Sequence, residues 1–413
     1  MSFNARWPYS ELGKEAFNAS RPFSFKLQPK VVFVNTGDVL KGKFLHSNIS
    51  DGLELPGQAK KALKADDILL TEIRPSNGRY AYVDFDAFNY VVSTKFMVIE
   101  SYGRVKPRFL YHVLTNQFAL DEFQRIAESR SGTFPQITFE SIEHFPIPLP
   151  PLSAQDALID FFDELEARIS LLYETNATLE AIAQALFKSW FVDFDPVRAK
   201  SEGKLPEGMD EATAALFPDA FEEAEFGMVP KGWQVQKFGD FIERLSVGRK
   251  FDQKSALVSG TVPILDQGKS GIIGFHNEAP SVKASLDTPV VVFANHTCYM
   301  RLICFDFSAI QNVLPFIGKG VDTVWAFYAT KDRIKFSEYK GHWPDFAIEK
   351  TVVPSEKLTH HYRSAVDSAV RRMRLNEMQA ETLANLRDTL LPRLISGQLR
   401  IADAEAELEK VTD

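Results

Sequence analysis

The sequence predicts an α/β (α+β) protein in which two similar mixed domains alternate with two long helices. The prediction rests first on two segments with helical apolar spacing, one starting after Pro150 and one after Pro354. These segments align without a gap at a constant shift of 204 residues, which places Pro150 opposite Pro354. Shorter stretches around Trp7 and Trp233 also repeat, so the chain is a tandem internal repeat.

The two long segments are predicted to be helices that pair with each other. Their apolar residues alternate steps of four and three, which is the a/d pattern of a coiled coil. Asn176 and Asn376 fall on this pattern near the middle of each segment, and a buried Asn at such a position can fix the pairing register. Pro392 is expected to end or kink the second helix. The predicted seam positions are Leu158, Phe162, Leu165, Ile169, Leu172, Asn176, Leu179, Ala183, Leu186 and Trp190, then Tyr362, Val366, Ala369, Met373, Asn376, Ala380, Leu383, Arg387, Leu390 and Leu394.

The two remaining stretches are predicted to be mixed domains made mainly of strands. Runs rich in β-branched and aromatic residues recur in the same order in both, each followed by a polar turn. A short helical stretch follows in each domain, near 109–114 and near 324–328. The matched strands are predicted at 31–34, 67–70 and 80–84 in the first domain, and at 262–265, 288–292 and 302–306 in the second.

These patterns divide the chain into six parts. The stretch between the first helix and the second domain is rich in Pro, Gly and Glu and is expected to be an exposed connector. The acidic end is expected to be frayed. The parts are a first domain at 1–147, a long helix at 148–195, a linker at 196–231, a second domain at 232–353, a second long helix at 354–400 and a tail at 401–413.

Composition favours a cytoplasmic protein without a membrane anchor. The net charge is −8, but the acidity is concentrated in the first helix and the linker, and both domains are mildly basic. Mild positive charge permits contact with phosphates without demonstrating it. Cys298 and Cys304 have no CxxC partner and are expected to be reduced. The N-terminus has no apolar signal region, and no run of 18 apolar residues occurs.

The sequence contains no convincing catalytic or metal-binding motif. An amino-methyltransferase loop needs a second proline and an aromatic residue that Asp193–Val197 lacks. A nuclease core is suggested by Pro344-Asp345, but Glu349 and Lys350 are adjacent where a spacing of two is needed. No Walker A motif occurs, so ATP-driven translocation by this chain is not expected.

The remaining candidates are polar residues in turns and loops that could contact base edges. Arg can bridge guanine O6 and N7, and Asn or Gln can bridge adenine N6 and N7. Each residue taken alone is more often a surface or turn residue, but they occur at matching places in both domains. The candidates are Arg74, Asn77, Arg79, Thr133 and Gln136 in the first domain, and Gln267, Lys269, Asn295, His296, Arg301 and His342 in the second.

Four segments resemble the specificity subunits of Type I restriction–modification systems. They are residues 131–137, 145–152, 186–194 and 229–233. The resemblance extends over nearly the whole chain. It implies two target-recognition domains separated by an antiparallel coiled coil, with each domain recognising one half of a split sequence in double-stranded DNA.

The resemblance also implies that the chemistry resides in partner chains. Two methylation subunits would carry S-adenosylmethionine, and two restriction subunits with motor and nuclease activity would use ATP and Mg. This chain would then be non-catalytic and hold no cofactor or metal, in agreement with the missing motifs. A solitary specificity-like protein that acts as a decoy or a regulator of restriction is the alternative.

Overall fold

The computed structural model describes residues 7–130, 133–268, 271–336, 338 and 340–412. The chain divides into two compact units. Unit 1 comprises residues 1–171 and 379–413, and unit 2 comprises residues 172–378. Both boundaries fall inside long helices, α5 (Leu152–Phe191) and α11 (Glu356–Ile395), so each helix continues from one unit into the other.

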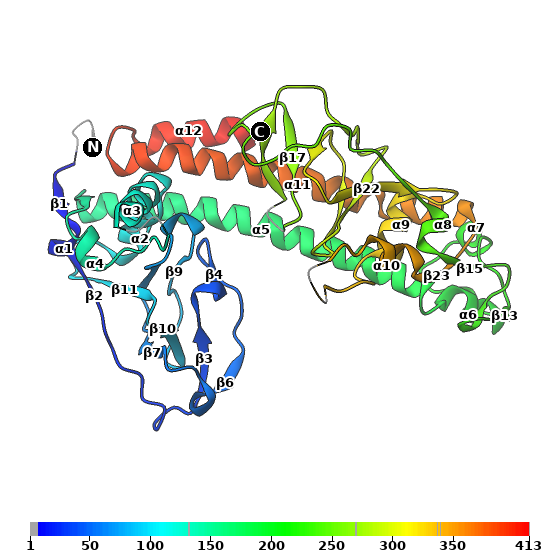
Figure 1. The fold of residues 1–413 in the computed structure, drawn as a ribbon, viewed down its shortest axis with the longest axis horizontal. Helices are drawn as coiled ribbons and strands as arrows, with labels where there is room; N and C mark the ends of the chain where they lie inside the picture. The colour runs from blue at the N-terminus through cyan, green and yellow to red at the C-terminus, as the bar shows by residue number, and fades with distance from the viewer. Residues whose placement is uncertain (1–6, 131–132, 269–270, 337, 339, 413) are drawn as a thin grey trace. The chain divides into compact units, whose positions relative to one another are not determined.

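Unit 1 holds a domain built on two sheets, here called domain 1 (Figure 1). One sheet has the strand order β2-β11-β8-β9 and is antiparallel throughout. The other has the order β6-β3-β10-β7, with β3 and β10 parallel. The elements are β1 (Tyr9–Glu11), α1 (Leu12–Glu15), β2 (Ala16–Asn18), β3 (Lys30–Val34), β4 (Val39–Leu40), β5 (Lys43–Phe44), β6 (Ile49–Asp51), β7 (Ala59–Ala62), β8 (Ile68–Thr71), β9 (Tyr80–Tyr82), β10 (Tyr90–Ser93), β11 (Phe96–Ser101), α2 (Pro107–Thr115), α3 (Gln117–Arg130), α4 (Phe139–Ile142), β12 (Pro146–Pro148) and, after α11, α12 (Ile401–Thr412).

Unit 2 holds a second domain of the same design, here called domain 2 (β15 to β23). Its antiparallel sheet has the order β16-β22-β19-β20, and its smaller sheet has the order β18-β17-β21, with β17 and β21 parallel. The elements are α6 (Asp195–Ser201), α7 (Glu211–Ala214), β13 (Phe221–Ala224), β14 (Gly227–Pro230), β15 (Gln234–Lys237), α8 (Phe238–Phe241), β16 (Ile242–Arg244), β17 (Val262–Leu265), β18 (Ile272–His276), β19 (Val290–Ala294), β20 (Met300–Ile303), β21 (Ser308–Ala309), β22 (Val313–Gly318), α9 (Thr323–Thr330), α10 (Trp343–Ile348) and β23 (Lys350–Val353).

The two domains repeat each other strand by strand, as the sequence predicts. The order β2-β11-β8-β9 corresponds to β16-β22-β19-β20, and the parallel pair β3/β10 corresponds to β17/β21. The predicted helical stretches are also confirmed as α2 and α9. In the described part of unit 2, β4, β5, β7 and α3 have no counterpart. The repeat therefore lies mainly in the antiparallel sheet and its flanking turns.

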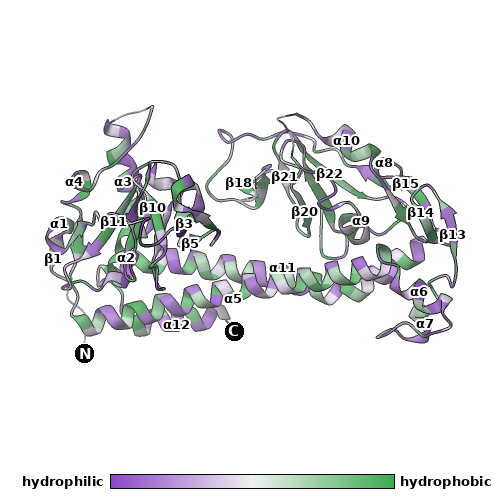
Figure 2. Ribbon diagram, turned by 90° about the horizontal axis from the view of Figure 1, so that it is seen from below, coloured by the Kyte–Doolittle hydropathy of each residue, from purple (hydrophilic) through white to green (hydrophobic). Residues whose placement is uncertain are grey.

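Aromatic and aliphatic side chains fill both domains, consistent with the hydrophobic colour along many strands in Figure 2. In domain 1, Val32, Phe96 and Val98 are part of one buried cluster. In unit 2 a larger cluster joins domain 2 to both long helices, with Trp325 of α9 beside Phe187 of α5. Side chains from the repeated strands and helices thus form the hydrophobic core on which the sheets pack.

Within unit 2 the two long helices run antiparallel. The Asn376 Nδ2 donates to the Asn176 Oδ1 at 2.8 Å, and the Tyr362 hydroxyl donates to the Ala183 carbonyl at 2.9 Å. Residue numbers therefore rise along α5 as they fall along α11. The predicted seam positions are buried or half-buried throughout, and the predicted Asn pair is confirmed.

We expect that replacing Asn376 with Ala lowers the free energy of unfolding by about 1–3 kcal/mol, because the half-buried Asn176 Oδ1 loses its donor. Asn376 is 1% exposed, whereas Asn385 on the same helix is exposed and serves as the matched control. Denaturant unfolding of N376A and N385A measures the difference. Equal stability of the two variants would contradict a structural role for the Asn pair.

Each domain is attached to α5 through one equivalent helix. In unit 1, the Arg108 and His112 side chains of α2 contact Asp163 of α5, at 2.8 and 3.4 Å. Burial would raise the pKa of Asp163, but hydrogen bonds from His112 and Arg108 hold it below its ordinary value. In unit 2, the Tyr328 hydroxyl of α9 donates to Glu180 of α5 at 2.8 Å. Burial and the Glu180 charge raise the pKa of Tyr328, so this hydroxyl stays a donor.

Both long helices are shorter than predicted at each end. The prolines at 148, 150 and 151 precede α5 because proline has no N–H to donate, and α5 begins at Leu152. Pro392 lies inside α11, which ends three residues later at Ile395. The backbone then turns at Gly397, whose φ of +73° favours glycine.

The linker, expected to be an exposed connector, is exposed along most of its length but contains regular elements. The tail, expected to be frayed, is helical, so that prediction is wrong. The linker at 196–231 forms α6, α7 and the hairpin β13–β14, because Val197, Phe217 and Val229 pack into the aromatic cluster of unit 2. The tail at 401–413 forms α12, in which Ala404 and Leu408 are buried.

Candidate nucleic-acid interface

Three segments of domain 1 meet where the sequence places its candidate residues. The Arg74 N–H donates to the Pro135 carbonyl at 3.1 Å, and Ile73 forms a β-bridge with Gln136. The Arg79 guanidinium donates to the carbonyls of Gly37 and Val39 at 3.1 and 2.9 Å. We call this meeting of residues 36–39, 72–79 and 133–137 junction 1.

The β8–β9 turn of junction 1 is held in a left-handed conformation at both ends. Arg74 has φ +44° and Gly78 has φ +67°, with the 3₁₀ turn Pro75–Asn77 between them. Left-handed backbone is unfavourable for arginine, so the surrounding hydrogen bonds must offset that cost. The Ser76 hydroxyl supplies one such bond by donating to Gln124 of α3 at 3.0 Å.

Four of the five candidate side chains in domain 1 are available to a ligand. Arg74, Asn77, Thr133 and Gln136 are exposed, and none has a side-chain partner among the residues that the structure describes. Arg79 differs because its guanidinium is already bound to two carbonyls, so it supports the turn.

Domain 2 brings together the equivalent three segments. The His296 N–H donates to the Gln267 Oε1 at 3.0 Å, and the Thr297 hydroxyl donates to the Gln267 carbonyl at 2.7 Å. The Trp343 N–H donates to the Asn295 Oδ1 at 2.8 Å, which attaches the start of α10 to the β19–β20 turn. We call this meeting of residues 266–268, 295–299 and 340–343 junction 2.

The candidate side chains of junction 2 are mostly engaged within the chain. Asn295 and Gln267 accept the bonds just described, and the His296 Nδ1 contacts the Lys340 carbonyl at 2.8 Å. His342 is 1% exposed and its Nε2 contacts the Glu338 carbonyl at 3.1 Å. A direct base contact by His342 would require this segment to move, because a buried ring offers no edge to a duplex. Lys269 lies outside the described residues.

Arg301 lies on β20 and packs against the backbone of Gly271. A Cβ at position 271 would lie 1.9 Å from the Arg301 Nη1, and Gly271 has φ +78°. Both the close approach of Arg301 and the positive φ therefore require glycine at position 271. The Arg301 Nη1 is buried and has no hydrogen-bond partner within the described part of the chain, which leaves one strong donor unsatisfied.

Three polar residues beside junction 2 escaped the sequence prediction. Lys250, Gln253 and Gln311 are exposed and line a pocket with Gln267 and Thr297. They lie in loops before β17 and before β22, away from the strand–turn–strand motif that singled out the other candidates. The only sequence signal for these three residues is that they are polar residues in loops.

Neither a cluster of metal-binding side chains nor a membrane-spanning helix is found among the described residues. No group of three His, Cys, Asp or Glu side chains among them is arranged to hold a metal. Within the same residues, no helix is both long and apolar enough to span a bilayer. Cys298 and Cys304 are free, and burial raises the pKa of both thiols, to about 11 for Cys304.

Proteins of known class resemble this chain along its length. A family model for the Type I restriction modification DNA specificity domain matches residues 11–181. The HindI specificity subunit of a Type I restriction enzyme from Haemophilus influenzae is 34% identical over 462 aligned residues, covering 95% of this chain and 99% of that protein. The MjaIX specificity subunit from Methanocaldococcus jannaschii is 22% identical over 330 residues, covering 72% of this chain and 70% of that protein.

Two solved structures also align with most of the chain. The HsdS subunit from Thermoanaerobacter tengcongensis gives a TM-score of 0.40 at 16% identity, covering 95% of this chain and 97% of that one. The Type I S subunit from M. genitalium gives 0.49 at 14% identity, covering 95% and 96%. Sequence identity of 34% across nearly all of both proteins decides the family. The chain belongs to the specificity subunits of Type I restriction enzymes.

Proposed function

We propose that this chain recognises a bipartite DNA sequence and directs adenine methylation and DNA cleavage by partner subunits. Domain 1 recognises one half-site and domain 2 the other. The observation that carries the proposal is the repetition of one junction in both domains, with polar side chains gathered from three separate segments. In protein–DNA complexes, such side chains supply sequence recognition through base edges.

The chemistry is assigned to the partner chains. Two methylation subunits carry S-adenosylmethionine, and two restriction subunits use ATP and Mg, while this chain is non-catalytic and acts in the cytoplasm. An internal repeat supports two methylation subunits, because it offers two equivalent docking surfaces on one polypeptide. The mass of a reconstituted complex tests this stoichiometry, and one methylation subunit per chain at saturation would count against it.

The function is tested by co-expressing the chain with its methylation subunit in a host that lacks DNA methylation. Sequencing of modified adenines should reveal one motif with two fixed halves and an unspecified spacer. The purified chain alone, incubated with S-adenosylmethionine and DNA, should transfer no methyl group. A continuous motif, or methyl transfer by the isolated chain, would refute the proposal.

Arg74 is expected to contact one half-site, because its guanidinium is exposed and has no partner in the described chain. Replacing it with Ala should reduce discrimination at that half-site by about 1–3 kcal/mol if the contact to guanine is bidentate. Arg74→Lys separates two roles, because lysine keeps the charge but loses the planar fork. Methylation rates on single-base variants of the motif measure the change.

Arg125→Ala is the matched control, since its guanidinium pairs with Glu122 on the same helix at 2.6 Å. R74A should lose preference at one position of the motif if Arg74 contacts a base, and R74K should keep only part of that preference. An R74A variant that weakens all sequences equally and lowers the salt dependence would instead indicate a phosphate contact.

A further inference from the structure

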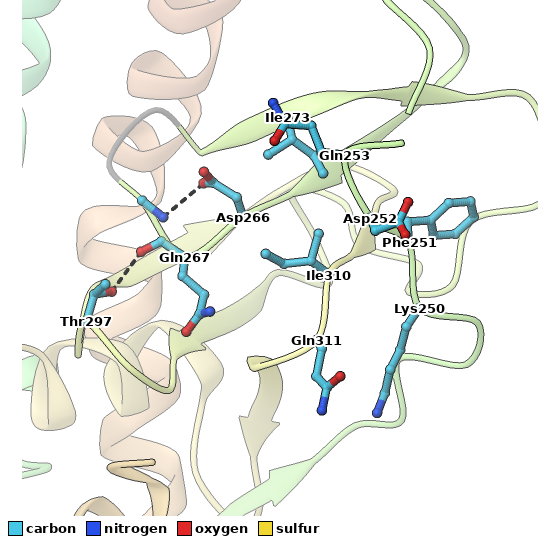
Figure 3. Close-up of a pocket in the computed structure, with 11 residues that line it drawn as sticks. Lys250, Phe251, Asp252, Gln253, Asp266, Gln267, Ile273, Thr297, Ile310 and Gln311 are labelled. Atoms are coloured by element: carbon cyan, nitrogen blue, oxygen red, sulfur yellow. Dashed lines mark hydrogen bonds between the residues drawn. The ribbon is translucent and has the colours of Figure 1, made fainter. Parts of the chain in front are cut away.

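A pocket of about 590 Å³ with a mixed polar and apolar lining adjoins junction 2 (Figure 3). Part of its wall comes from junction 2 itself, through Gln267, Gly268 and Thr297. Asp266 of junction 2 also lines it, and the rest of the wall comes from residues 250–253, Ile273 and residues 310–311. The pocket is thus continuous with the surface where the candidate residues of domain 2 converge.

Three of the polar side chains that line the pocket form no hydrogen bond or ion pair within the described chain. Lys250, Gln253 and Gln311 have neither a hydrogen-bond nor an ion-pair partner among the residues described. In the view of Figure 3, Lys250, Gln267 and Gln311 extend the same way from three different segments. This contrasts with Asn295 and His342, whose polar groups contact other residues of the chain.

The loop that carries Lys250 and Gln253 is fixed by apolar contacts. Phe251 lies between them, is 6% exposed and stacks on the His276 ring with 4.2 Å between ring centroids. It also forms a β-bridge with Ile310, next to Gln311. These contacts fix the backbone that carries the three side chains, which reduces the backbone entropy lost on binding.

The charge of the pocket disfavours phosphate and suits neutral base edges. Lys250 contributes one positive charge, and Asp252 and Asp266 contribute two negative charges. Asp266 accepts from the Gly268 N–H at 3.0 Å and Asp252 from the Ser255 N–H at 2.9 Å, so both carboxylates are held in place. Fixed negative charges repel phosphate oxygens, whereas they can accept bonds from the amino groups of adenine or cytosine.

We propose that domain 2 recognises bases of its half-site at this pocket, with Lys250, Gln253 and Gln311 as specificity-determining residues. The two glutamine amides are suited to adenine N6 and N7, and the lysine ammonium to guanine O6 and N7. The proposal rests on the proposed function and assigns the base contacts to residues outside the polar network of junction 2.

The test uses the complex of the full chain with its methylation subunit and a DNA library randomised in both half-sites. Lys250→Ala, Gln253→Ala and Gln311→Ala should each relax the preference at one or two positions of one half-site, by roughly 5- to 150-fold. The other half-site, recognised by domain 1, should keep its preference and serves as an internal reference. Gln234→Ala, on exposed β15, is the matched control and should leave both halves unchanged.

Thermal unfolding should show little change, because the three side chains make no bonds within the described chain. Unchanged preferences in all three variants would overturn the proposal while leaving the bipartite function intact. So would a Lys250→Ala variant that weakens all sequences equally and lowers the salt dependence, because that result indicates a phosphate contact. Failure of the unaltered complex to select any bipartite motif would refute the proposed function itself.

Discussion

Replacing Trp325 with alanine is expected to lower the free energy of unfolding of unit 2 by about 3–5 kcal/mol. Trp325 is fully buried in α9. Its ring lies 5.9 Å from that of Phe191 on α5 and 5.6 Å from that of Phe241 on α8, measured between centroids. Loss of this side chain removes one of the contacts that join domain 2 to α5 and leaves a cavity among closely packed rings.

Two further variants separate packing from hydrogen bonding. The Trp325 indole nitrogen is buried without a hydrogen-bond partner among the described residues, so Trp325→Phe should cost much less than Trp325→Ala. Phe226→Ala, at a half-exposed position of the same unit, should be nearly neutral. Denaturant unfolding with limited proteolysis of 172–378 measures the effect. A W325A variant as stable as F226A would contradict the central position of this residue in the core.

The long helices and their pairing were predictable because the signal is periodic and local. Steps of three and four place one face of α5 and α11 toward a partner, and a polar residue on that face needs a polar partner. Asn176 and Asn376 satisfied this condition, and they bond to each other at 2.8 Å. The antiparallel direction came from the family resemblance, since periodicity alone does not set direction.

The regular elements of the linker and the tail were not predicted, because the apolar pattern in both segments is sparse. In the tail, Ala404 and Leu408 are four residues apart and share one helix face, so the signal was present but short. In the linker, Val197 and Phe217 belong to separate elements that pack on the end of α5. Their burial depends on contacts with distant residues, which local spacing does not encode.

The sequence predicted which turns carry the candidate residues, but it did not predict which of their side chains are free to contact a ligand. The position between matched strands located both junctions. Whether a side chain is free depends on tertiary hydrogen bonds, such as those that engage Asn295 and Arg79 and leave Arg74 exposed. The direct DNA contacts of all these residues stay predictions.

Lengthening both long helices by seven residues is expected to lengthen the unspecified spacer of the target without changing either half-site. Both helices continue from one unit into the other, and seven residues preserve the a/d phase of the pairing. Seven residues add about 10.5 Å of helix, which corresponds to about three base pairs of duplex. Duplicating residues 165–171 in α5 and 381–387 in α11 makes this change.

Lengthening α5 alone serves as the control. It leaves the Asn176–Asn376 pair of unit 2 in register but moves the unit 1 part of α5 by a full heptad relative to α11, so the seam contacts there no longer match and stability should fall. Mapping methylated adenines in cells that carry each variant gives the spacer directly. The doubly lengthened chain should methylate the original half-sites at the longer separation, because the residues of junctions 1 and 2 are untouched. An unchanged spacer, or a change in the recognised bases, would show that the helices do not set the distance between the half-sites.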